Sequence, residues 1–320
     1  MSATKVARGE PKNRLSAPNK QNVFKRFWKT RFLFALFLPA LVYFIMFKYV
    51  PMWGVSIAFY KYSIFKGLAG RKFIGLYNFK IFFQSPEWWK YTKNTLALGA
   101  MGVFITFPLT IIFALLLNEV RGERFKKVTQ TVSYLSHFLS VVVVVGLMKS
   151  LCDPTTGAIN AIIKFFGGQP IYFFTETKWF RPLYEISALW AQLGWGTIVY
   201  LAAISSVDPG LYEAARLDGA SRLRQMMNIT IPSIMPTVST MFIMKIGHIM
   251  GDSLEKVLLM QSAVTYEVSQ TISTYSYYVG LSKGNYDFGT AISLYCNIVN
   301  LVFLFGSNFV SKKLTENSIF

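Results

Sequence analysis

Six long apolar runs, separated by polar stretches, dominate the pattern of this chain after residue 30. They lie at residues 32–49, 95–117, 128–149, 183–205, 233–250 and 288–310. Each run is long enough for a helix to cross roughly 30 Å of hydrocarbon at about 1.5 Å per residue. The pattern therefore predicts an all-α integral membrane protein with about six transmembrane helices. Lys245 and His248 lower the hydropathy of the fifth run, which is the weakest of these predictions.

A polar and charged segment, residues 206–232, separates the fourth run from the fifth. Asp208 and Pro209 predict the start of a helix, because Asp caps a helix and Pro fits its first position. Gly219 predicts a sharp turn, and Ser221 can cap a second short helix. The segment therefore predicts a helix-turn-helix elbow beside a membrane. Its predicted apolar docking side consists of Leu211, Ala214, Ala215, Met226 and Met227.

The spacing within this elbow resembles the signature loop of bacterial ABC-importer permeases. That signature is Glu-Ala-Ala, three residues, Gly, nine residues and Ile-x-Leu/Ile-Pro, and the match here consists of Glu213, Ala214, Ala215, Gly219, Ile229, Ile231 and Pro232. Asp218 and Ala220 complete the Asp-Gly-Ala form of the sugar-permease branch. In that family the elbow is a coupling helix held in a cleft of the ATPase subunit. The resemblance implies ATPase coupling by Glu213, Ala214, Ala215, Asp218, Gly219, Ala220 and Pro232.

Shorter motifs extend the resemblance from about residue 30 to the C-terminus. Residues 73–79 resemble the Gly-Leu-x-Asn-Phe stretch before the second span, and residues 94–96 resemble the Asn-Thr-Leu that opens it. Residues 157–160 resemble a Gly-x-x-Asn motif, within a connection at 151–182 that is too long for a simple turn. The end of the chain resembles the oligosaccharide and polysaccharide subgroup. The resemblance implies the type I importer permease fold over residues 31–320.

Residues 1–30 form a basic segment that precedes the permease domain and that the resemblance does not cover. The segment holds eight Lys and Arg residues, and we expect its first part to be disordered. From Phe24 on, Phe and Trp alternate with the charges, which predicts a helix at the membrane interface. No small-residue cleavage site follows, so a cleaved signal peptide is not expected.

Composition and charge support membrane insertion. Of the 320 residues, 53% are hydrophobic and 15% are charged, while the formal net charge is +18. The basic residues lie between apolar runs, which favours anionic headgroups or an anionic substrate over nucleic acid. The chain contains no P-loop, no His-Glu-x-x-His and no Gly-x-Ser-x-Gly motif, and its two His residues are too few for a histidine metal cluster. We therefore expect a non-catalytic subunit without a metal site.

Polar side chains within the predicted spans are candidates for lining a transport pathway, because such groups are costly in hydrocarbon. Lys245 and His248 are three positions apart and share one face of the fifth helix, with Gly247 and Gly251 leaving room beside them. Lys245 lies roughly 18 Å along that helix from Ser233, which places it toward the outer side. The further candidates are Trp190, Gln192, Trp195, Tyr295, Asn297 and Asn300.

Each candidate also has a purely structural interpretation. Lys245 could extend outward or pair with Asp252 or Glu255. Core packing accounts equally for the aromatic residues of the fourth span, and hydrogen bonds between helices account for the polar residues of the sixth. His137, in the third span, is expected to be a core residue.

The resemblance implies one permease subunit of a bacterial importer that takes up an oligo- or polysaccharide. The implied partners are a second permease, two ATP-binding subunits that carry ATP and Mg²⁺, an extracytoplasmic solute-binding protein and the lipid bilayer. The net charge and Lys245 favour an acidic, alginate-like glycan. The alternatives are a neutral oligosaccharide, a transporter or channel that needs no ATPase, and a membrane enzyme acting on lipid-linked sugars.

The expected location is the bacterial cytoplasmic membrane, with both termini in the cytoplasm. The parts on the cytoplasmic side would then be residues 1–31, 119–127, 206–232 and 311–320, which hold 18 of the 33 Lys and Arg residues. That excess is small, so the positive-inside rule favours this orientation only weakly. The elbow favours it more strongly, because a coupling helix must face the cytoplasm.

Overall fold

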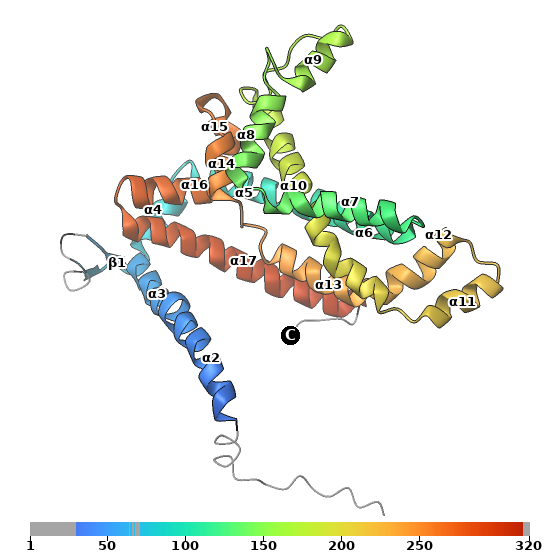
Figure 1. Ribbon diagram of the computed structural model, residues 1–320. Helices are drawn as coiled ribbons and strands as arrows, with labels where there is room; N and C mark the ends of the chain where they lie inside the picture. The colour runs from blue at the N-terminus through green and yellow to red at the C-terminus, as the bar shows by residue number, and fades with distance from the viewer. Residues whose placement is uncertain (1–29, 64, 66, 68–70, 316–320) are drawn as a thin grey trace, which may run out of the picture. The chain divides into compact units, whose positions relative to one another are not determined.

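The computed structural model describes residues 30–63, 65, 67 and 71–315, and its ribbon is shown in Figure 1. The described chain is almost entirely helical, as the sequence predicts. It divides into two compact units, Met1–Gly54 and Val55–Phe320. The predicted interfacial helix that starts at Phe24 lies outside the described residues.

The first unit contains the first predicted span. Helix α2 (Arg31–Phe44) continues through a π-helical turn, η1 (Ile45–Tyr49), into α3 (Val50–Met52). A 3₁₀ helix, η2 (Trp53–Phe59), follows and enters the second unit. Pro39 lies inside α2 without ending the helix. No side chain of α2 is buried within the chain, and the helix is apolar all round, which is the surface that lipid requires.

The second unit contains one small hairpin and all the remaining helices. Strands β1 (Tyr60–Lys61) and β2 (Lys72–Phe73) pair antiparallel, with Tyr60 opposite Phe73. The helical elements before the elbow are α4 (Tyr77–Gln84), α5 (Trp88–Met101), η3 (Gly102–Thr106), α6 (Phe107–Glu119), α7 (Glu123–Leu135), η4 (Ser136–Phe138), α8 (Val141–Leu151), α9 (Ala158–Phe165) and α10 (Thr177–Ser205). From the elbow on they are α11 (Pro209–Leu217), α12 (Arg222–Gln225), η5 (Met226–Thr230), α13 (Ile231–Ile246), α14 (Leu254–Met260), η6 (Ala263–Thr265), α15 (Tyr266–Ser269), α16 (Ile272–Tyr277), η7 (Tyr278–Ser282) and α17 (Tyr286–Thr315).

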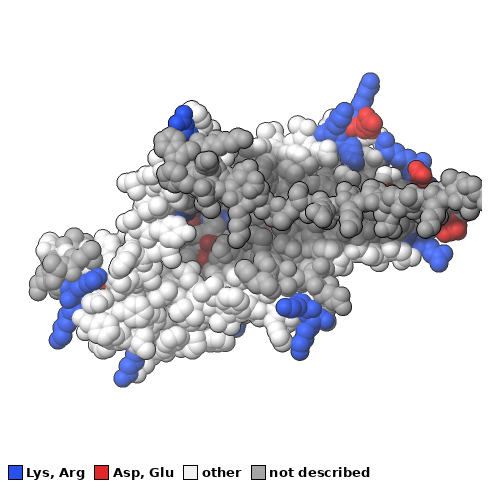
Figure 2. Space-filling view, turned by 90° about the horizontal axis from the view of Figure 1, so that it is seen from below, with Lys and Arg blue, Asp and Glu red and all other residues white. Residues whose placement is uncertain are grey.

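Five helical stretches among the described residues are long and apolar enough to cross a membrane. They are Arg31–Phe59, Trp88–Glu119, Thr177–Ser205, Arg222–Ile246 and Tyr286–Lys313. Figure 2 shows one face of the protein, where the surface not covered by grey atoms is mostly uncharged and Lys and Arg lie at its margins. The five helical stretches named above correspond to five of the six predicted spans.

The third predicted span, residues 128–149, is not one straight helix. Helices α7 and α8 are bent by 105° relative to one another. The chain leaves the 3₁₀ turn η4 in an extended conformation at Leu139, and Ser140 then caps α8 by accepting a hydrogen bond from the Val143 N–H. The Ser140 cap begins a new helix, so the apolar run is divided between two directions.

The fifth predicted span is displaced along the chain. The helical stretch begins at Arg222, because α12 continues through the π-helical turn η5 into α13, and it ends at Ile246 rather than at residue 250. Lys245 therefore lies in the last turn of α13, and His248 lies beyond the helix end. Periodicity along an apolar run does not reveal this end, because residues 249 and 250 remain apolar.

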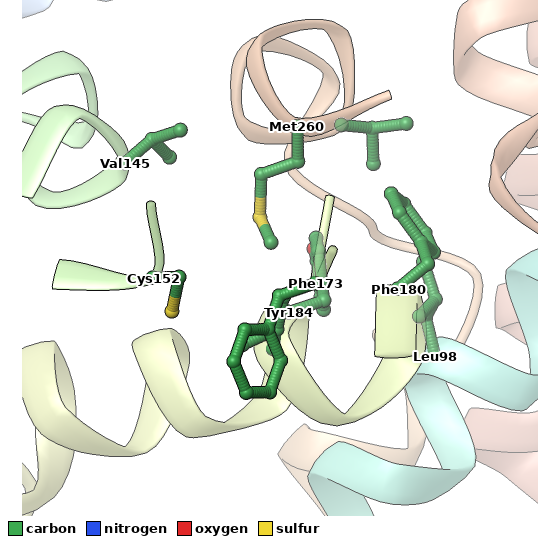
Figure 3. Close-up of a cluster of buried hydrophobic side chains, with 9 residues drawn as sticks. Leu98, Val145, Cys152, Phe173, Phe180, Tyr184 and Met260 are labelled. Atoms are coloured by element: carbon green, nitrogen blue, oxygen red, sulfur yellow. The ribbon is translucent and has the colours of Figure 1, made fainter. Parts of the chain in front are cut away.

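Helix α10 lies at the centre of the second unit, with contacts to α5, α6, α7, α8, α13 and α14. One buried cluster joins α5, α8, α10 and α14, and Figure 3 shows Met260 lying between Val145 and Cys152 on one side and Phe180 and Leu98 on the other. Burial of such side chains contributes roughly 25 cal/mol per Å² of apolar surface removed from water. The cluster fixes α14 against α10 at the end of α13 opposite the elbow.

Three buried asparagines explain the short sequence motifs. Asn78 donates to the Ala58 carbonyl at 3.0 Å, which ties α4 to the segment before the hairpin. Asn94 donates to the carbonyls of Glu267 and Gln270, both at 2.9 Å. The Asn94 oxygen also accepts from Arg181 at 2.9 Å. Each amide therefore replaces the secondary-structure partners that loop backbone lacks.

Asn160 makes more hydrogen bonds than either of the other two asparagines. Its amide nitrogen donates to the carbonyls of Cys152, Asp153 and Ile171, and its oxygen accepts from the Ile171 N–H at 2.8 Å. A Cβ at Gly157 would lie 2.5 Å from the Asp153 backbone, so this motif also requires a glycine. The Gly-x-x-Asn motif thus closes the connection between α8 and α10.

We predict that Asn160→Ala lowers the free energy of unfolding by about 1–3 kcal/mol, because buried carbonyls lose their donor. Thermal unfolding of the purified protein in detergent measures this effect. Asn297→Ala is the matched control, since Asn297 is exposed on α17. Equal melting temperatures for the two variants would contradict the role given to Asn160.

Candidate functional site

The elbow has the helix-turn-helix form that the sequence predicts. The Asp208 side chain caps α11 by accepting from the Gly210 N–H at 2.9 Å. Gly219 has a φ of +72°, a conformation that L side chains rarely adopt, and it ends α11. Ser221 caps α12 by accepting from the Arg224 N–H. The Gln225 amide, which is buried, donates to the Ala220 carbonyl at 2.8 Å and holds the turn against α12.

Two side-chain contacts attach the elbow to neighbouring helices. The Tyr212 hydroxyl lies 2.9 Å from the Thr230 hydroxyl, which joins α11 to the start of α13. Arg222 lies 3.5 Å from the Glu119 carboxylate at the end of α6. Pro232 is the second residue of α13, directly after the π-helical turn η5, where a residue without an N–H cannot bond back to the preceding turn. Because α12 runs through η5 into α13, the second half of the elbow and α13 form one continuous helical stretch.

The apolar surface of the elbow differs from the predicted docking side. Leu211 and Met227 are exposed as expected, but Ala215 and Met226 are partly buried against the protein. Leu217, which the sequence interpretation did not select, is 90% exposed at the end of α11. The only sign of this exposure in the sequence is that Leu217 stands between two charged residues.

Glu213 and Ala214 are exposed on α11, and none of the ion pairs among the described residues involves Glu213. Asp218 and Gly219 are also exposed, whereas Ala220 is half-buried beside Gln225. The elbow therefore presents an unpaired carboxylate beside bare apolar side chains. Such a surface fits a protein partner better than water.

A cavity of about 140 Å³ lies at the other end of α13. It contains three of the predicted pathway residues: Gln192 from α10, Lys245 from α13 and His248 from the turn after it. It also contains Thr106, Glu185 and Asp252, which the sequence interpretation did not assign to the pathway. Segments far apart in the sequence, α5, α10, α13 and the residues after α13, thus meet around a single polar cavity.

Lys245 reaches toward the α5–η3 helix rather than toward an acidic partner. A Cβ on Gly102 would lie 3.3 Å from the Lys245 ammonium nitrogen. No ion pair of the described residues includes Lys245, so the expected alternative of a pair with Asp252 or Glu255 is wrong. The carboxylate of Asp252 instead accepts hydrogen bonds from Thr271 and Ser273, both at 2.6 Å.

Of the two glycines expected to leave room beside Lys245, Gly251 lines the cavity and Gly247 does not. A Cβ on Gly247 would come within 2.6 Å of Leu304, so Gly247 serves the packing of α13 against α17. Gly99 and Gly102 line the cavity together with Gly251, and a Cβ on Gly99 would overlap the Ile249 carbonyl at 1.8 Å. Gly99 and Gly102 belong to the facing helix, whose contribution the sequence of one helix cannot reveal.

Charges of both signs surround this cavity. Glu185 is buried and accepts a hydrogen bond from Thr106. Lys256 is buried beside it, donates to the Tyr184 carbonyl at 2.6 Å and lies 4.1 Å from the centre of the Tyr184 ring. Burial lowers the pKa of Lys256 to about 8, although the charge of Glu185 opposes the shift. Burial also raises the pKa of Asp252, although the hydrogen bonds from Ser273 and Thr271 oppose the shift. The cavity is therefore polar and mixed in charge.

The other predicted pathway residues do not line the cavity. Trp195 stacks on His137, with ring centres 4.5 Å apart and planes 4° from parallel. His137 is exposed, so its expected place in the core is wrong. The Trp190 side chain is 45% exposed on α10. Its backbone carbonyl accepts a hydrogen bond from the Ser136 hydroxyl.

The three α17 candidates also lie elsewhere. Tyr295 packs on Phe82, with ring centres 5.3 Å apart. Asn300 accepts a hydrogen bond from the Met250 N–H at 2.9 Å. Asn297 is exposed. In the described chain, Tyr295 and Asn300 serve helix packing, which is the structural interpretation left open from the sequence.

Several known proteins are similar to this chain in sequence and in fold. Residues 108–315 match the family described as "Binding-protein-dependent transport system inner membrane component". The chain is 44% identical over 290 residues to the "Polygalacturonan/rhamnogalacturonan transport system permease protein YteP" of Bacillus subtilis, covering 91% of this chain and 90% of the relative. It is 38% identical over 292 residues to "Protein LplB" of the same organism, covering 91% and 92%.

Among solved structures, a chain of a bacterial ABC transporter involved in the import of the acidic polysaccharide alginate has a TM-score of 0.84 and 37% identity. The match covers 92% of this chain and 100% of that chain. A second structure, of a bacterial alginate ABC transporter in complex with alginate pentasaccharide-bound periplasmic protein, matches with a TM-score of 0.84 and 36% identity. That match covers 93% of this chain and 100% of the other.

We predict that the wild type gains stability relative to Lys256→Met as the pH rises from about 8 toward 10.5, the ordinary Lys value. In that interval the folded side chain is largely neutral while the unfolded one still binds a proton, so rising pH favours the folded state. Below pH 8 the difference between the two proteins should be constant. Thermal unfolding against pH measures this, with Lys283→Met, at an exposed lysine, as the control. A wild-type advantage that falls over the same interval would show that Lys256 is stabilised in its charged form.

Proposed function

The chain belongs to the family of inner membrane components of binding-protein-dependent transport systems, and from that membership we propose that it forms, with a second permease, the translocation pathway of an ATP-driven importer for an acidic oligo- or polysaccharide. Members of this family are multi-pass, non-catalytic membrane subunits of ABC importers. That excludes both a membrane enzyme and a transporter or channel that works without an ATPase.

The observation that carries the substrate proposal is the similarity to two permeases across nine tenths of the chain. One is named for polygalacturonan and rhamnogalacturonan, and the other belongs to an importer of alginate, an acidic polysaccharide. Polygalacturonan and alginate are both chains of sugars that carry carboxylates. Lys245 supports the proposal, because its unpaired ammonium lines the cavity and can follow a moving carboxylate without fixed geometry.

A neutral oligosaccharide is the second candidate, and the cavity itself contains the observation that favours it. Glu185 and Asp252 line the same cavity as Lys245. Two carboxylates reduce the positive potential that a purely basic cavity would offer. Both keep their hydrogen-bond partners within the protein, from Thr106 for Glu185 and from Thr271 and Ser273 for Asp252. Lys245 would then be the residue that decides between the two substrate classes.

The elbow would couple the cavity to ATP hydrolysis in the partner subunits, which carry ATP and Mg²⁺. Its exposed Leu217 and Leu211 and the unpaired Glu213 would lie in the ATPase cleft. Closure of the ATPase dimer would displace α11 and α12, and η5 would transmit that displacement into α13. Lys245 is in the last turn of α13, so the cavity would change with the position of the elbow. The movement is a rigid-body change of the kind that links two sites in other transporters.

This assignment also proposes an orientation in the membrane. The elbow and both termini would face the cytoplasm, and the segment from α14 to η7 would face outward. A solute-binding protein would then deliver the saccharide to that outer side, and a second permease would complete the pathway.

We predict that Gly219→Val lowers substrate-stimulated ATP hydrolysis of the assembled complex roughly ten-fold. Val at the φ of +72° is strained by about 1–2 kcal/mol, which shifts the turn that holds α11. Gly219→Asn should retain most of the activity, because Asn tolerates this conformation. Gly146→Val is the matched control, since open space surrounds Gly146 on α8. Wild-type stimulation in Gly219→Val would remove the coupling role of the turn.

We predict that Lys245→Met lowers uptake of an acidic oligosaccharide roughly ten-fold, the scale of a lost charge-assisted hydrogen bond. Uptake of the same oligosaccharide with its carboxyl groups reduced to alcohols should change little. Radiolabelled uptake into proteoliposomes that hold the complete complex measures both, and Lys164→Met, on the exposed side of α9, is the control. An equal loss for both substrates would favour the neutral-oligosaccharide candidate.

A further inference from the structure

A second cavity, of about 370 Å³, lies on the segment from α14 to η7, away from Lys245. Its lining is unusual, since most of the side chains are aromatic with a hydroxyl or carry an amide. The five tyrosines are Tyr91, Tyr266, Tyr275, Tyr277 and Tyr278. Gln261 and Gln270 add two amides. The volume is at the lower end of the range for small-molecule sites, roughly 300–1,000 Å³.

One wall of this tyrosine cavity is rigid. Tyr91 and Tyr275 stack with ring centres 4.5 Å apart, and both belong to the buried cluster around Phe82 and Ile272. The rim is more open, because Tyr266, Tyr277 and Tyr278 are 42%, 40% and 54% exposed. Rings that are fixed on one side and open on the other form a surface for a ligand with an apolar face.

The loop that bears Gln270 is also held in place. Asn94 donates to the carbonyls of Glu267 and Gln270, and the Thr95 hydroxyl accepts from the Ile272 N–H at 2.9 Å. These bonds attach residues 267–272 to α5, so the amide and the tyrosine wall come from one rigid body. A preformed cavity loses less conformational entropy when it binds a ligand.

Cations lie over two of the rings. The Lys283 ammonium is 4.9 Å from the centre of the Tyr278 ring, and the Lys90 ammonium is 5.7 Å from that of Tyr91. Lys90 is paired with Glu87 at 2.9 Å, whereas no ion pair of the described residues includes Lys283. Lys283 is therefore a cation at the rim that a carboxylate could reach.

Shared wall residues relate the tyrosine cavity to the cavity of Lys245. Tyr277 also lines a third cavity, of about 400 Å³, which contains Ser273 and Ser276. Ser273 donates to Asp252 at 2.6 Å, and Asp252 lines the cavity of Lys245. Tyr277 thus lines both the tyrosine cavity and the third cavity, and the hydrogen bond from Ser273 to Asp252 joins the wall of the third cavity to that of the Lys245 cavity.

We propose that the tyrosine cavity is an outer saccharide subsite, which holds sugar units of a chain whose leading end enters the Lys245 cavity. The proposal rests on the proposed function, since it assumes a saccharide substrate and an outward-facing α14–η7 segment. Sugar rings have apolar C–H faces that pack on tyrosine, and hydroxyls that bond to amides and phenols. The carboxylates of an acidic chain would pair with Lys283. The subsite favours a polymer over a disaccharide, because only a longer chain reaches both cavities.

The test compares uptake of galacturonic acid oligosaccharides of two and of eight units. Proteoliposomes hold the complete complex, with a saturating concentration of its solute-binding protein. We expect Tyr277→Ala to lower the ratio of octamer to dimer uptake roughly five-fold, the scale of about 1 kcal/mol of aromatic contact. Tyr277→Phe keeps the ring and should keep the ratio. Tyr172→Ala is the matched control, because Tyr172 is 57% exposed outside the three cavities.

Either of two other outcomes for Tyr277→Ala would overturn the proposal of a saccharide subsite. An equal loss for both lengths in Tyr277→Ala would make the cavity a docking surface for the binding protein or a structural element. An unchanged ratio in Tyr277→Ala would show that no sugar unit binds there. Failure of the proposed function is distinguishable, because the wild-type complex would then take up neither oligosaccharide, whichever residue occupies position 277.

Discussion

The structure depends on one constraint: polar atoms buried among its helices need hydrogen-bonding partners. A bundle of apolar helices provides no water to its interior, so each inserted amide or charge must find a protein partner. Asn94 meets this requirement by bonding to two loop carbonyls and to Arg181, and Asn160 does so by closing the connection after α8. Lys256 and Glu185 lie together in the same way, next to Tyr184 and Thr106. The residues that hold the loops thereby also shape both the polar cavity and the tyrosine cavity.

Helix α13 connects the two functional ends of the second unit. Its N-terminal end continues from the elbow through η5, and its last turn carries Lys245. Two tight approaches hold the turn after α13: Gly247 lies against Leu304 of α17, and Gly99 of α5 lies against the Ile249 carbonyl. Side chains packed this closely have few alternative arrangements. One continuous helical stretch thus runs from the elbow to the cavity, as the proposed coupling requires.

Substrate selection by such a protein need not depend on net charge. The chain has a formal charge of +18, yet the cavity that contains Lys245 also contains two carboxylates. Binding would come from a few placed groups: a mobile ammonium, aromatic faces and amides along α16. An acidic polymer suits this arrangement, because it offers repeated apolar ring faces together with repeated carboxylates. The same arrangement would account for the proposed preference for long chains without a deep pocket.

The sequence by itself determined the helical class, most of the spans and the elbow. Hydropathy reflects the cost of polar groups in lipid, and caps such as Asp208 and Ser221, with Gly219 between them, act within a few residues. Three of the predicted pathway residues, Gln192, Lys245 and His248, line one cavity, and their role in transport stays a prediction. The tertiary structure alone decided the bend between α7 and α8, the early end of α13, the packing of Gly247 on Leu304 and the places of Trp190, Trp195, Tyr295, Asn297 and Asn300 outside the cavity. A helical period shows which residues share a face, but which neighbour that face meets depends on contacts between segments far apart in the chain.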